Sequence, residues 1–330
     1  LVTLLTMLIV GKGVQKGIEK SVSWMMPGLV IMLVVLIGFG LFSGGFGAAV
    51  NFLFSFNAGS LSSEGLLAAL GHAFFTLSLA SGAILTYGSY LPKEASIGRT
   101  TVSVAVADTV VALMAGLAIF PVIFANGMNP GQGPGLIFMS LPLAFQAMPL
   151  GTLFGILFFL MLSMAALTSA ISMVEATVSW LCDNKGLSRP AAAWGTGIVL
   201  WLISTLAMLS FNLGAEWTLA DKTFFDWLDY LTSRWMMPLG GLGMVVLAGF
   251  VLKSDTFREE LGLSPLPYAL WLAMVRYVSP LGIVVIFVDA LGIYQVSFAA
   301  HWPWLLAILV VMAVLGESLS PRLRSALRTG

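Results

Sequence analysis

The sequence predicts an all-α integral membrane protein, and three observations support that prediction. Hydrophobic residues make up 59% of the 330 positions and charged residues 9%, whereas about 25% of the residues of a soluble domain are charged. The apolar residues gather in runs of about 20, the length that a helix needs to cross a bilayer. The basic residues gather in alternate connections between these runs, as the positive-inside rule describes.

The predicted membrane segments follow one another with short polar or glycine-rich connections. Leu1–Val10 has about half of the roughly 20 residues of a span. We therefore expect it to be the end of a helix whose start, with further membrane segments, lies upstream. The segments after it are Ser21–Phe42, Gly65–Leu91, Val102–Phe124, Thr152–Leu181, Ala191–Phe211, Asp226–Leu252, Tyr268–Ile293 and the shorter Pro303–Leu315.

The connections give their own signals. Gly44–Glu64 is rich in Gly and Ser and Lys253–Pro265 is rich in charge, so both are predicted to be loops. Ala125–Leu150 starts with Gly and Pro and then turns apolar, which predicts a loop followed by a short helix lying against the protein. Ser188 before Pro190 predicts a helix start, because Ser caps a helix and Pro fits its first turn.

The distribution of basic residues predicts the orientation in the membrane. Lys and Arg total 15, and all except Lys222 and Arg234 lie in or beside one alternate set of connections. This set includes the tail Gly316–Gly330. The excess marks the cytoplasmic side, so we expect a cytoplasmic C-terminus.

Composition also excludes several classes of function. The net charge is zero, and no strongly basic tract indicates a nucleic-acid partner. The one cysteine, Cys182, and the two histidines, His72 and His301, are too few and too dispersed for a Cys- or His-based metal site. An intramembrane enzyme is the least favoured class, because no nucleophile–base pair, HExxH motif or pair of catalytic aspartates is found.

Two membrane segments are predicted to be interrupted. In the segment Asp226–Leu252 the interruption is Pro238-Leu239-Gly240-Gly241. In Gly71–Tyr90 it is the polar stretch from Thr76 to Gly82. Non-helical backbone at membrane depth is tolerated inside protein or beside a watery cavity, and secondary transporters use such breaks to hold ions and substrates. Hydroxyls that bond to their own helix explain the same residues equally well, so both interpretations are open at this point.

Ionisable residues inside the apolar segments are functional candidates, because charge is costly there. Asp108 lies near the middle of its segment, Glu175 near a cytoplasmic end, Asp183 at a segment end and Asp229 near an outer end. Three of them have a structural alternative: a packing hydrogen bond for Asp108, packing or snorkelling for Glu175, and a solvated helix end for Asp183. Arg234 is able to pair with an acid or to snorkel outward.

A second cluster of hydroxyls, Thr168-Ser169, lies in the middle of the segment Thr152–Leu181. Small residues of this kind often serve helix packing. Together with Thr76, Ser78 and Asp108 they supply hard oxygen ligands, which suit alkali cations. These residues are the components of a cation site built from one carboxylate, hydroxyls and free carbonyls.

Several motifs together resemble the neurotransmitter:sodium symporter family, especially its bacterial amino-acid transporters. They are KGVQKGIEK followed by MMPG, LLAALGHAFFTLSLASGAILTYGSY, ADTVVALMAGLAIFPVIF, GPGLIFMSLPLAF, MAALTSAISMVEATVSWL and FDWLDYLTSRWMMPLGG. They occur in the family's order and cover nearly the whole chain. The resemblance implies an inverted-repeat sodium-symporter fold in a bacterial inner membrane. Residues 1–330 would then be one transmembrane domain with the end of helix 4, helices 5 to 12 and a broken sixth helix.

The resemblance implies two sodium sites. Thr76 and Asp108 match ligands of the first site, and Ala165, Thr168 and Ser169 match the second, the alanine through its carbonyl. The family often carries an amide at the position of Asp108. A carboxylate there resembles members that do not require chloride, although some of these carry the acid one turn later, where this chain has Ala112. We therefore expect chloride independence.

The resemblance also implies a substrate pocket and gates. The pocket positions are Phe75, which closes over the substrate, and Ser78, Ser81, Ser172 and Met173. Ser81 replaces a bulky aromatic residue of some relatives, which favours a larger substrate side chain. The gate positions are Tyr90 and Asp183 on the inner side and Asp229 on the outer side, and His72 is expected to be a hydrogen-bonding neighbour of the site.

The implied function is sodium-coupled symport of a neutral, hydrophobic or aromatic amino acid by alternating access. The expected partners are this amino acid and membrane lipid. The oligomeric state is left open, with a homodimer as one option. The family's first repeat, including its broken first helix, lies outside these 330 residues, so we expect no transport by this chain alone. Two alternatives stay open: a non-transporting sensor or accessory subunit of the same fold, and a proton-coupled carrier that uses Asp108 or Glu175.

Overall fold

The computed structural model describes residues 1–56, 63–130, 135–252 and 254–290. Within these ranges the secondary structure is helical, apart from an isolated β-bridge between Leu219 and Lys222. Six helical segments of the described chain are long and apolar enough to cross a membrane: Val14–Leu41, Ile97–Ala125, Gly151–Lys185, Arg189–Leu209, Phe224–Val251 and Pro265–Asp289. The predicted all-α membrane architecture is confirmed.

The chain divides into two compact units. Unit 1 comprises Leu1–Asn57 and Val104–Leu202, and unit 2 comprises Ala58–Ser103 and Ile203–Gly330. Each unit is thus assembled from two separate stretches of sequence. Two of the three boundaries fall inside the long helices α6 (Ile97–Ala125) and α9 (Arg189–Leu209), and the first falls between α3 and α4. The candidate functional residues are distributed over both units.

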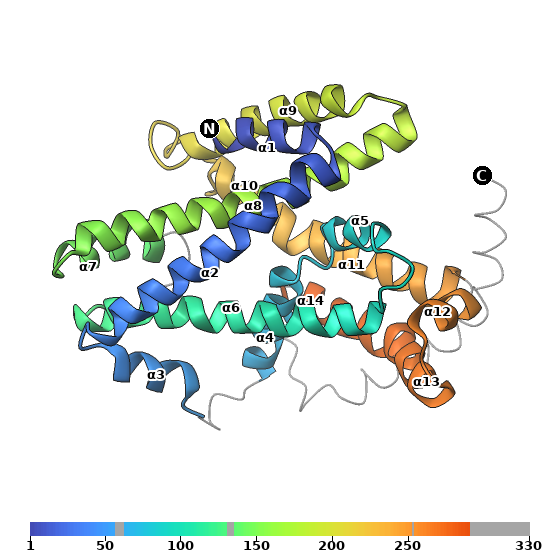
Figure 1. The fold of residues 1–330 in the computed structure, drawn as a ribbon, viewed down its shortest axis with the longest axis horizontal. Coiled ribbons are helices and arrows are strands. Elements are labelled where there is room, and N and C mark those ends of the chain that lie inside the picture. The colour runs from blue at the N-terminus through green and yellow to red at the C-terminus, as the bar shows by residue number, and fades with distance from the viewer. Residues whose placement is uncertain (57–62, 131–134, 253, 291–330) are drawn as a thin grey trace. The chain divides into compact units, whose positions relative to one another are not determined.

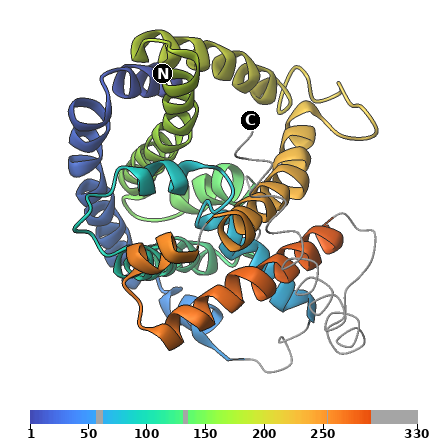
Figure 2. The same cartoon turned by 90° about the vertical axis from the view of Figure 1, so that its right-hand side faces the viewer.

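Unit 1 is built around α8, a helix of 35 residues. The helix α1 and the α2 that follows it both pack against α8; Figure 1 shows α2 crossing α8, and Figure 2 shows the bend between α1 and α2 in blue. The helical elements that contribute to unit 1 are α1 (Val2–Gly11), η1 (Val14–Glu19), α2 (Lys20–Leu41), α3 (Phe46–Phe54), most of α6 (Ile97–Ala125), η3 (Leu136–Ser140), α7 (Leu141–Gln146), α8 (Gly151–Lys185) and the first part of α9 (Arg189–Leu209).

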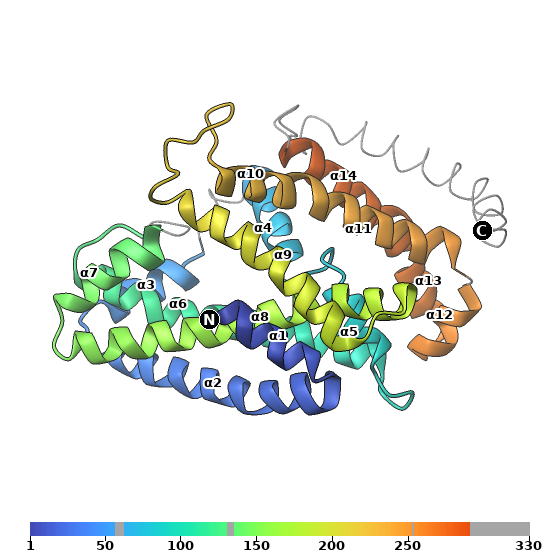
Figure 3. The same cartoon turned by 90° about the horizontal axis from the view of Figure 1, so that it is seen from above.

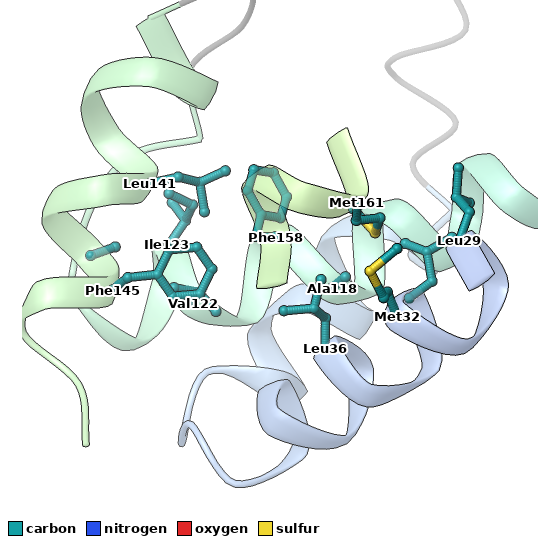
Figure 4. Close-up of a cluster of buried hydrophobic side chains, with 12 residues drawn as sticks. Leu29, Met32, Leu36, Ala118, Val122, Ile123, Leu141, Phe145, Phe158 and Met161 are labelled. Carbon is teal, nitrogen blue, oxygen red and sulfur yellow. The ribbon is translucent and has the colours of Figure 1, made fainter. Parts of the chain in front are cut away.

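The core of unit 1 lies where α2, α6, α7 and α8 meet. Figure 4 shows Phe145 and Phe158 close to Val122, and all three side chains are buried. Phe39 of α2 stacks on Phe154 of α8 with ring centroids 3.9 Å apart. Because lipid tails are as apolar as these side chains, such a core is stabilised mainly by close packing rather than by expulsion of water.

Unit 2 contains a broken helix and two long helical segments that carry π-helical turns. In Figure 3 the segments that include α11 and α14 run side by side, in agreement with their contacts. Arg276 Nε donates to the carbonyl of Gly249 at 2.7 Å, which joins the π turns of these two segments. Besides the start of α6 and the end of α9, the helical elements of unit 2 are α4 (Ser63–Thr76), α5 (Ala83–Ser89), α10 (Phe224–Leu231), η4 (Thr232–Met236), α11 (Met237–Val246), η5 (Leu247–Val251), α12 (Ser254–Leu261), α13 (Pro265–Ala273), η6 (Met274–Val278) and α14 (Ser279–Ala290).

The structure corrects two predicted loops. Gly44–Glu64 contains the helix α3, where Phe52 packs edge-on against Phe120 of α6 with ring centroids 4.9 Å apart. Lys253–Pro265 contains the helix α12, where Phe257 packs on Trp271 at 5.4 Å. In both places a tertiary contact of one aromatic side chain stabilises a short helix that composition did not indicate.

The predicted interruption at Pro238 takes a milder form than expected. The chain stays helical from Phe224 to Val251, and the π turn η4 directly precedes α11, which carries Pro238 in its first turn. Proline has no N–H to donate and clashes with the preceding turn, so a wider turn accommodates it without ending the helix. The short helix within Ala125–Leu150 and the helix start after Ser188 are confirmed. The last predicted span, Pro303–Leu315, lies outside the described residues.

Candidate functional site

The predicted broken helix is present in unit 2. The helix α4 ends at Thr76 and α5 begins at Ala83, so six residues separate the two half-helices. Ser78 and Gly82 adopt left-handed backbone conformations, with φ of 51° and 80°. Gly adopts this conformation at no steric cost, whereas it is uncommon for a serine. The Ser81-Gly82 pair and the strained Ser78 therefore mark the two ends of the break.

The break leaves backbone oxygens without helical partners. The carbonyl of Ser78 accepts hydrogen bonds from Ser81 N at 3.3 Å and from Ser81 Oγ at 3.0 Å. In the part of the chain that the structure describes, the carbonyls of Leu77, Leu79 and Ala80 accept no hydrogen bond. Oxygens of this kind are the hard ligands that a dehydrated alkali cation needs.

This region contains the three predicted pocket positions that belong to unit 2. Phe75, on the last turn of α4, is 58% exposed, and His72 is exposed one turn earlier. Ser78 and Ser81 are half-buried within the break. Ser81 Oγ also accepts a hydrogen bond from Ala83 N at 3.4 Å, so it contributes to the start of α5. The structure thus brings Phe75, Ser78 and Ser81 together at one interruption.

The second cluster of predicted ligands lies on the continuous helix α8 in unit 1. Thr168 Oγ1 donates to the carbonyl of Ala165 at 2.8 Å, and Ser172 Oγ donates to the carbonyl of Thr168 at 3.1 Å. Ser169 is exposed, and so is Met173 one turn later. These five positions recur at helical spacing along one side of α8, so the carbonyl and hydroxyl oxygens of the cluster are close to one another.

The first predicted sodium site combines residues of different units. Thr76 belongs to unit 2, whereas Asp108 belongs to unit 1, where it lies half-buried on α6. The predicted substrate pocket likewise draws on the break of unit 2 and on Ser172 and Met173 of unit 1. No group of three or more His, Cys, Asp or Glu side chains suited to a metal ion occurs among the described residues.

The predicted gate residues occupy helix ends. Asp183 is exposed in the last turn of α8 and accepts a hydrogen bond from Ser179 Oγ at 3.3 Å. Asp229, exposed on α10, accepts one from Ser233 Oγ at 3.1 Å. Tyr90 caps the C-terminal end of α5, with its ring centroid 6.3 Å from that of Tyr87. Both carboxylates are thus exposed and accept a hydrogen bond from a serine four residues away on the same helical segment.

Sequence reasoning missed the ion pair between Glu175 and Arg189. Glu175 of α8 is completely buried and accepts a hydrogen bond from Nη2 of Arg189, the first residue of α9. Arg189 Nε also donates to the carbonyl of Val10 at 3.4 Å, so one guanidinium joins α1, α8 and α9. A buried carboxylate is stabilised by a nearby cation. Arg189, the first basic residue after the turn between α8 and α9, was therefore the signal available in the sequence.

Broken membrane helices are a feature of many secondary transporters. The sequence profile described as "Sodium:neurotransmitter symporter family" matches residues 1–325. The chain therefore belongs to the sodium:neurotransmitter symporter family.

Individual relatives agree with this assignment. The chain is 38% identical over 293 residues to an uncharacterized sodium-dependent transporter of Bacillus subtilis, YhdH, covering 88% of this chain and 65% of that protein. It is 34% identical over 289 residues to an uncharacterized sodium-dependent transporter of Haemophilus influenzae, covering 86% of this chain and 63% of that protein. Its fold is similar to that of MhsT in complex with L-phenylalanine, with a TM-score of 0.78, 38% identity and coverage of 88% of this chain and 66% of MhsT. The chain thus spans about two thirds of the length of these relatives.

Proposed function

We propose that this chain takes part in sodium-coupled symport of a neutral amino acid with a hydrophobic or aromatic side chain across a bacterial inner membrane, with its C-terminal tail in the cytoplasm. The observation that supports the proposal most directly is the break between Thr76 and Ala83, with three carbonyls that accept no hydrogen bond in the described chain. The similarity to MhsT, whose structure contains L-phenylalanine, supports an aromatic substrate.

The proposal includes two sodium sites. Thr76 and Asp108 are assigned to the first, and the Ala165 carbonyl with the hydroxyls of Thr168 and Ser169 to the second. In the second site the hydroxyl of Thr168 already lies 2.8 Å from the Ala165 carbonyl, so small adjustments of two oxygens on one helix turn suffice to receive an ion. The carboxylate of Asp108 supplies a negative charge beside the first ion, and the proposed mechanism therefore does not require chloride.

Coupling follows from charge and geometry. A sodium ion that enters the cell releases about 2.3 kcal/mol per 100 mV of membrane potential. A substrate carboxylate next to that ion is attracted strongly in a poorly hydrated pocket. Each ligand then raises the affinity of the other by the same factor. The N-terminal end of α5, which begins at Ala83, is the positive end of a short helix dipole and adjoins the break. It therefore favours the negative charge of the substrate carboxylate.

The test is binding of radiolabelled L-phenylalanine to the protein expressed from its complete reading frame, with sodium or with potassium. We expect binding with sodium, and loss of the sodium dependence in the double variant Thr168→Ala, Ser169→Ala. Ser163→Ala is the matched control, because its hydroxyl also bonds to its own helix, with the Phe159 carbonyl 2.8 Å away. Unchanged sodium dependence in the double variant would contradict the assignment.

Uptake into proteoliposomes separates the proposal from its alternatives. Sodium-driven accumulation supports symport, and binding without flux supports a sensor or accessory subunit. Uptake that follows a pH gradient and ignores sodium supports a proton-coupled carrier. Replacing chloride with gluconate is expected to leave sodium-driven uptake unchanged.

A further inference from the structure

Two adjacent glycines of α11 pack directly against the broken helix, and both elements belong to unit 2. A Cβ atom built on Gly240 would lie 3.0 Å from the carbonyl oxygen of Ala80. A Cβ atom built on Gly241 would lie 2.0 Å from Cζ of Phe74. Gly241 has no space for a side chain in this arrangement, and at Gly240 the approach to Ala80 is tighter than ordinary van der Waals contact.

The atoms that these glycines meet belong to the functional part of the broken helix. Ala80 lies inside the break, and its carbonyl is one of those that accept no hydrogen bond in the described chain. Phe74 precedes the pocket position Phe75, and its own carbonyl accepts the Leu79 N–H at 3.4 Å, the bond that spans the start of the break. Gly240 therefore contacts the break itself, and Gly241 contacts the last turn of α4 that leads into it.

Close glycine packing is common between membrane helices and often has no role beyond association. Here the partner is an irregular backbone segment rather than the side of a regular helix. A cavity of about 900 Å³ lies beside the contact and is lined by Leu79 and Ile84 of the broken helix and by Val245 and Ile283 of the facing helices. Because packing is less extensive along this cavity, the glycine contact has a large share in fixing where the break lies.

We propose that Gly240 and Gly241 are positioning residues that set the direction of the Ala80 carbonyl and the end of α4, and through them the affinities for sodium and substrate. The inference rests on the proposed function, because it assigns the break to ion and substrate binding. Binding groups must be held within about 0.5 Å of their productive geometry. A methyl group at position 240 requires the Ala80 carbonyl to move by a few tenths of an ångström.

The first test compares Gly240→Ala with Gly243→Ala. Gly243 lies on the same helix and has open space around it, so its methyl group meets nothing. Both substitutions favour the helical state to the same extent. We expect Gly240→Ala to raise the sodium concentration for half-maximal L-phenylalanine binding about tenfold, which corresponds to about 1.4 kcal/mol. Gly243→Ala is expected to leave this concentration unchanged, and neither variant is expected to have a lower thermal midpoint than the wild type.

The second test uses complementary changes in size. Gly241→Ala is expected to weaken sodium-dependent binding more than Gly240→Ala, since its methyl group meets an aromatic ring. Shortening the facing side chain in the double variant Gly241→Ala, Phe74→Leu is expected to restore most of the lost affinity. This pair also keeps the inference testable if Gly240→Ala fails to fold.

The outcomes distinguish this inference from the proposed function. If the wild-type protein shows no sodium-dependent binding, the proposed function fails and the positioning role fails with it. If the wild type binds with sodium, but Gly240→Ala matches Gly243→Ala and Gly241→Ala binds like the wild type, the positioning role alone is wrong. A loss of thermal stability in Gly240→Ala or Gly241→Ala with unchanged ligand affinities would also overturn it, because the glycines would then serve folding only.

Discussion

The broken helix of unit 2 and the long helix α8 of unit 1 carry similar residues but have different structures. The break contains Ser78 and Ser81 and directly follows Thr76, and the middle of α8 contains Thr168, Ser169 and Ser172. The first group interrupts a helix for six residues, whereas the second lies within 35 continuous helical residues. A cluster of hydroxyls therefore does not by itself break a membrane helix.

The difference lies in the backbone next to the hydroxyls and in the packing around them. In α8, Thr168 and Ser172 donate to carbonyls of the preceding turn and leave the helix intact. In the break, Gly82 adopts a left-handed conformation and Ser81 bonds to the turn instead of to a helix. The helix α8 is also held by a buried face that includes Phe158 and packs against its neighbours. Such packing favours the continuous helix over a local break.

The largest effect is expected when the ion pair that joins α8 to its neighbours is removed. Arg189→Ala leaves the completely buried Glu175 without its cation, which costs about 3–5 kcal/mol. Thermal unfolding in detergent should show a much lower midpoint than for Lys185→Ala, a control in the last turn of α8 whose amine lies 5.7 Å from the Trp180 ring. The double variant Glu175→Leu, Arg189→Leu should recover part of the loss. A stable Arg189→Ala protein would show that α8 does not depend on this pair.

An intermediate effect is expected at the glycine that ends the break. Gly82→Ala places a Cβ atom at a φ of 80°, and the left-handed conformation costs an L-residue roughly 1–2 kcal/mol. The control Gly88→Ala lies in α5 with open space around it, and it should be neutral or stabilising. Unfolding midpoints of the two variants test this difference. Equal midpoints would mean that the turn at Gly82 is not a structural requirement.

The smallest effect separates the roles of the hydroxyls themselves. Ser81→Ala removes the bonds to the Ser78 carbonyl and from the Ala83 N–H, and should destabilise the protein by about 1 kcal/mol. Ser172→Ala removes a bond from a hydroxyl to its own helix, and should change the stability by less than about 0.5 kcal/mol. Matched unfolding curves decide between them, and the reverse order would contradict the difference described between the two regions.

Local sequence signals predicted much of the fold correctly. The break appears where three hydroxyl residues and Gly82 interrupt an apolar run, and α7 appears in the apolar half of a Gly/Pro-rich connection. The helices α3 and α12 were not predicted, because each is stabilised by an aromatic contact with a helix distant in sequence. The same limit explains why Arg189 was not identified as the partner of Glu175.

The candidate site was likewise predictable from the sequence only in part. The chemistry of its residues, hard oxygens on a broken helix and on α8, can be read directly from the sequence. The contact of Gly240 with Ala80 cannot, because a glycine in a long apolar segment has the same local signal whether its surroundings are open, as at Gly243, or filled by a carbonyl.

The sequence by itself determined that this protein is a helical membrane chain of one transporter family and determined where its helix breaks. These features depend on hydrophobicity, on runs of residues long enough to span a bilayer, and on the conformational freedom of single residues such as Gly82, all of which are local. The tertiary structure decided which acid is paired, which glycines have no space for a side chain, and which backbone oxygens are left without partners. Those properties depend on atoms that are distant along the chain and become neighbours when the helices pack.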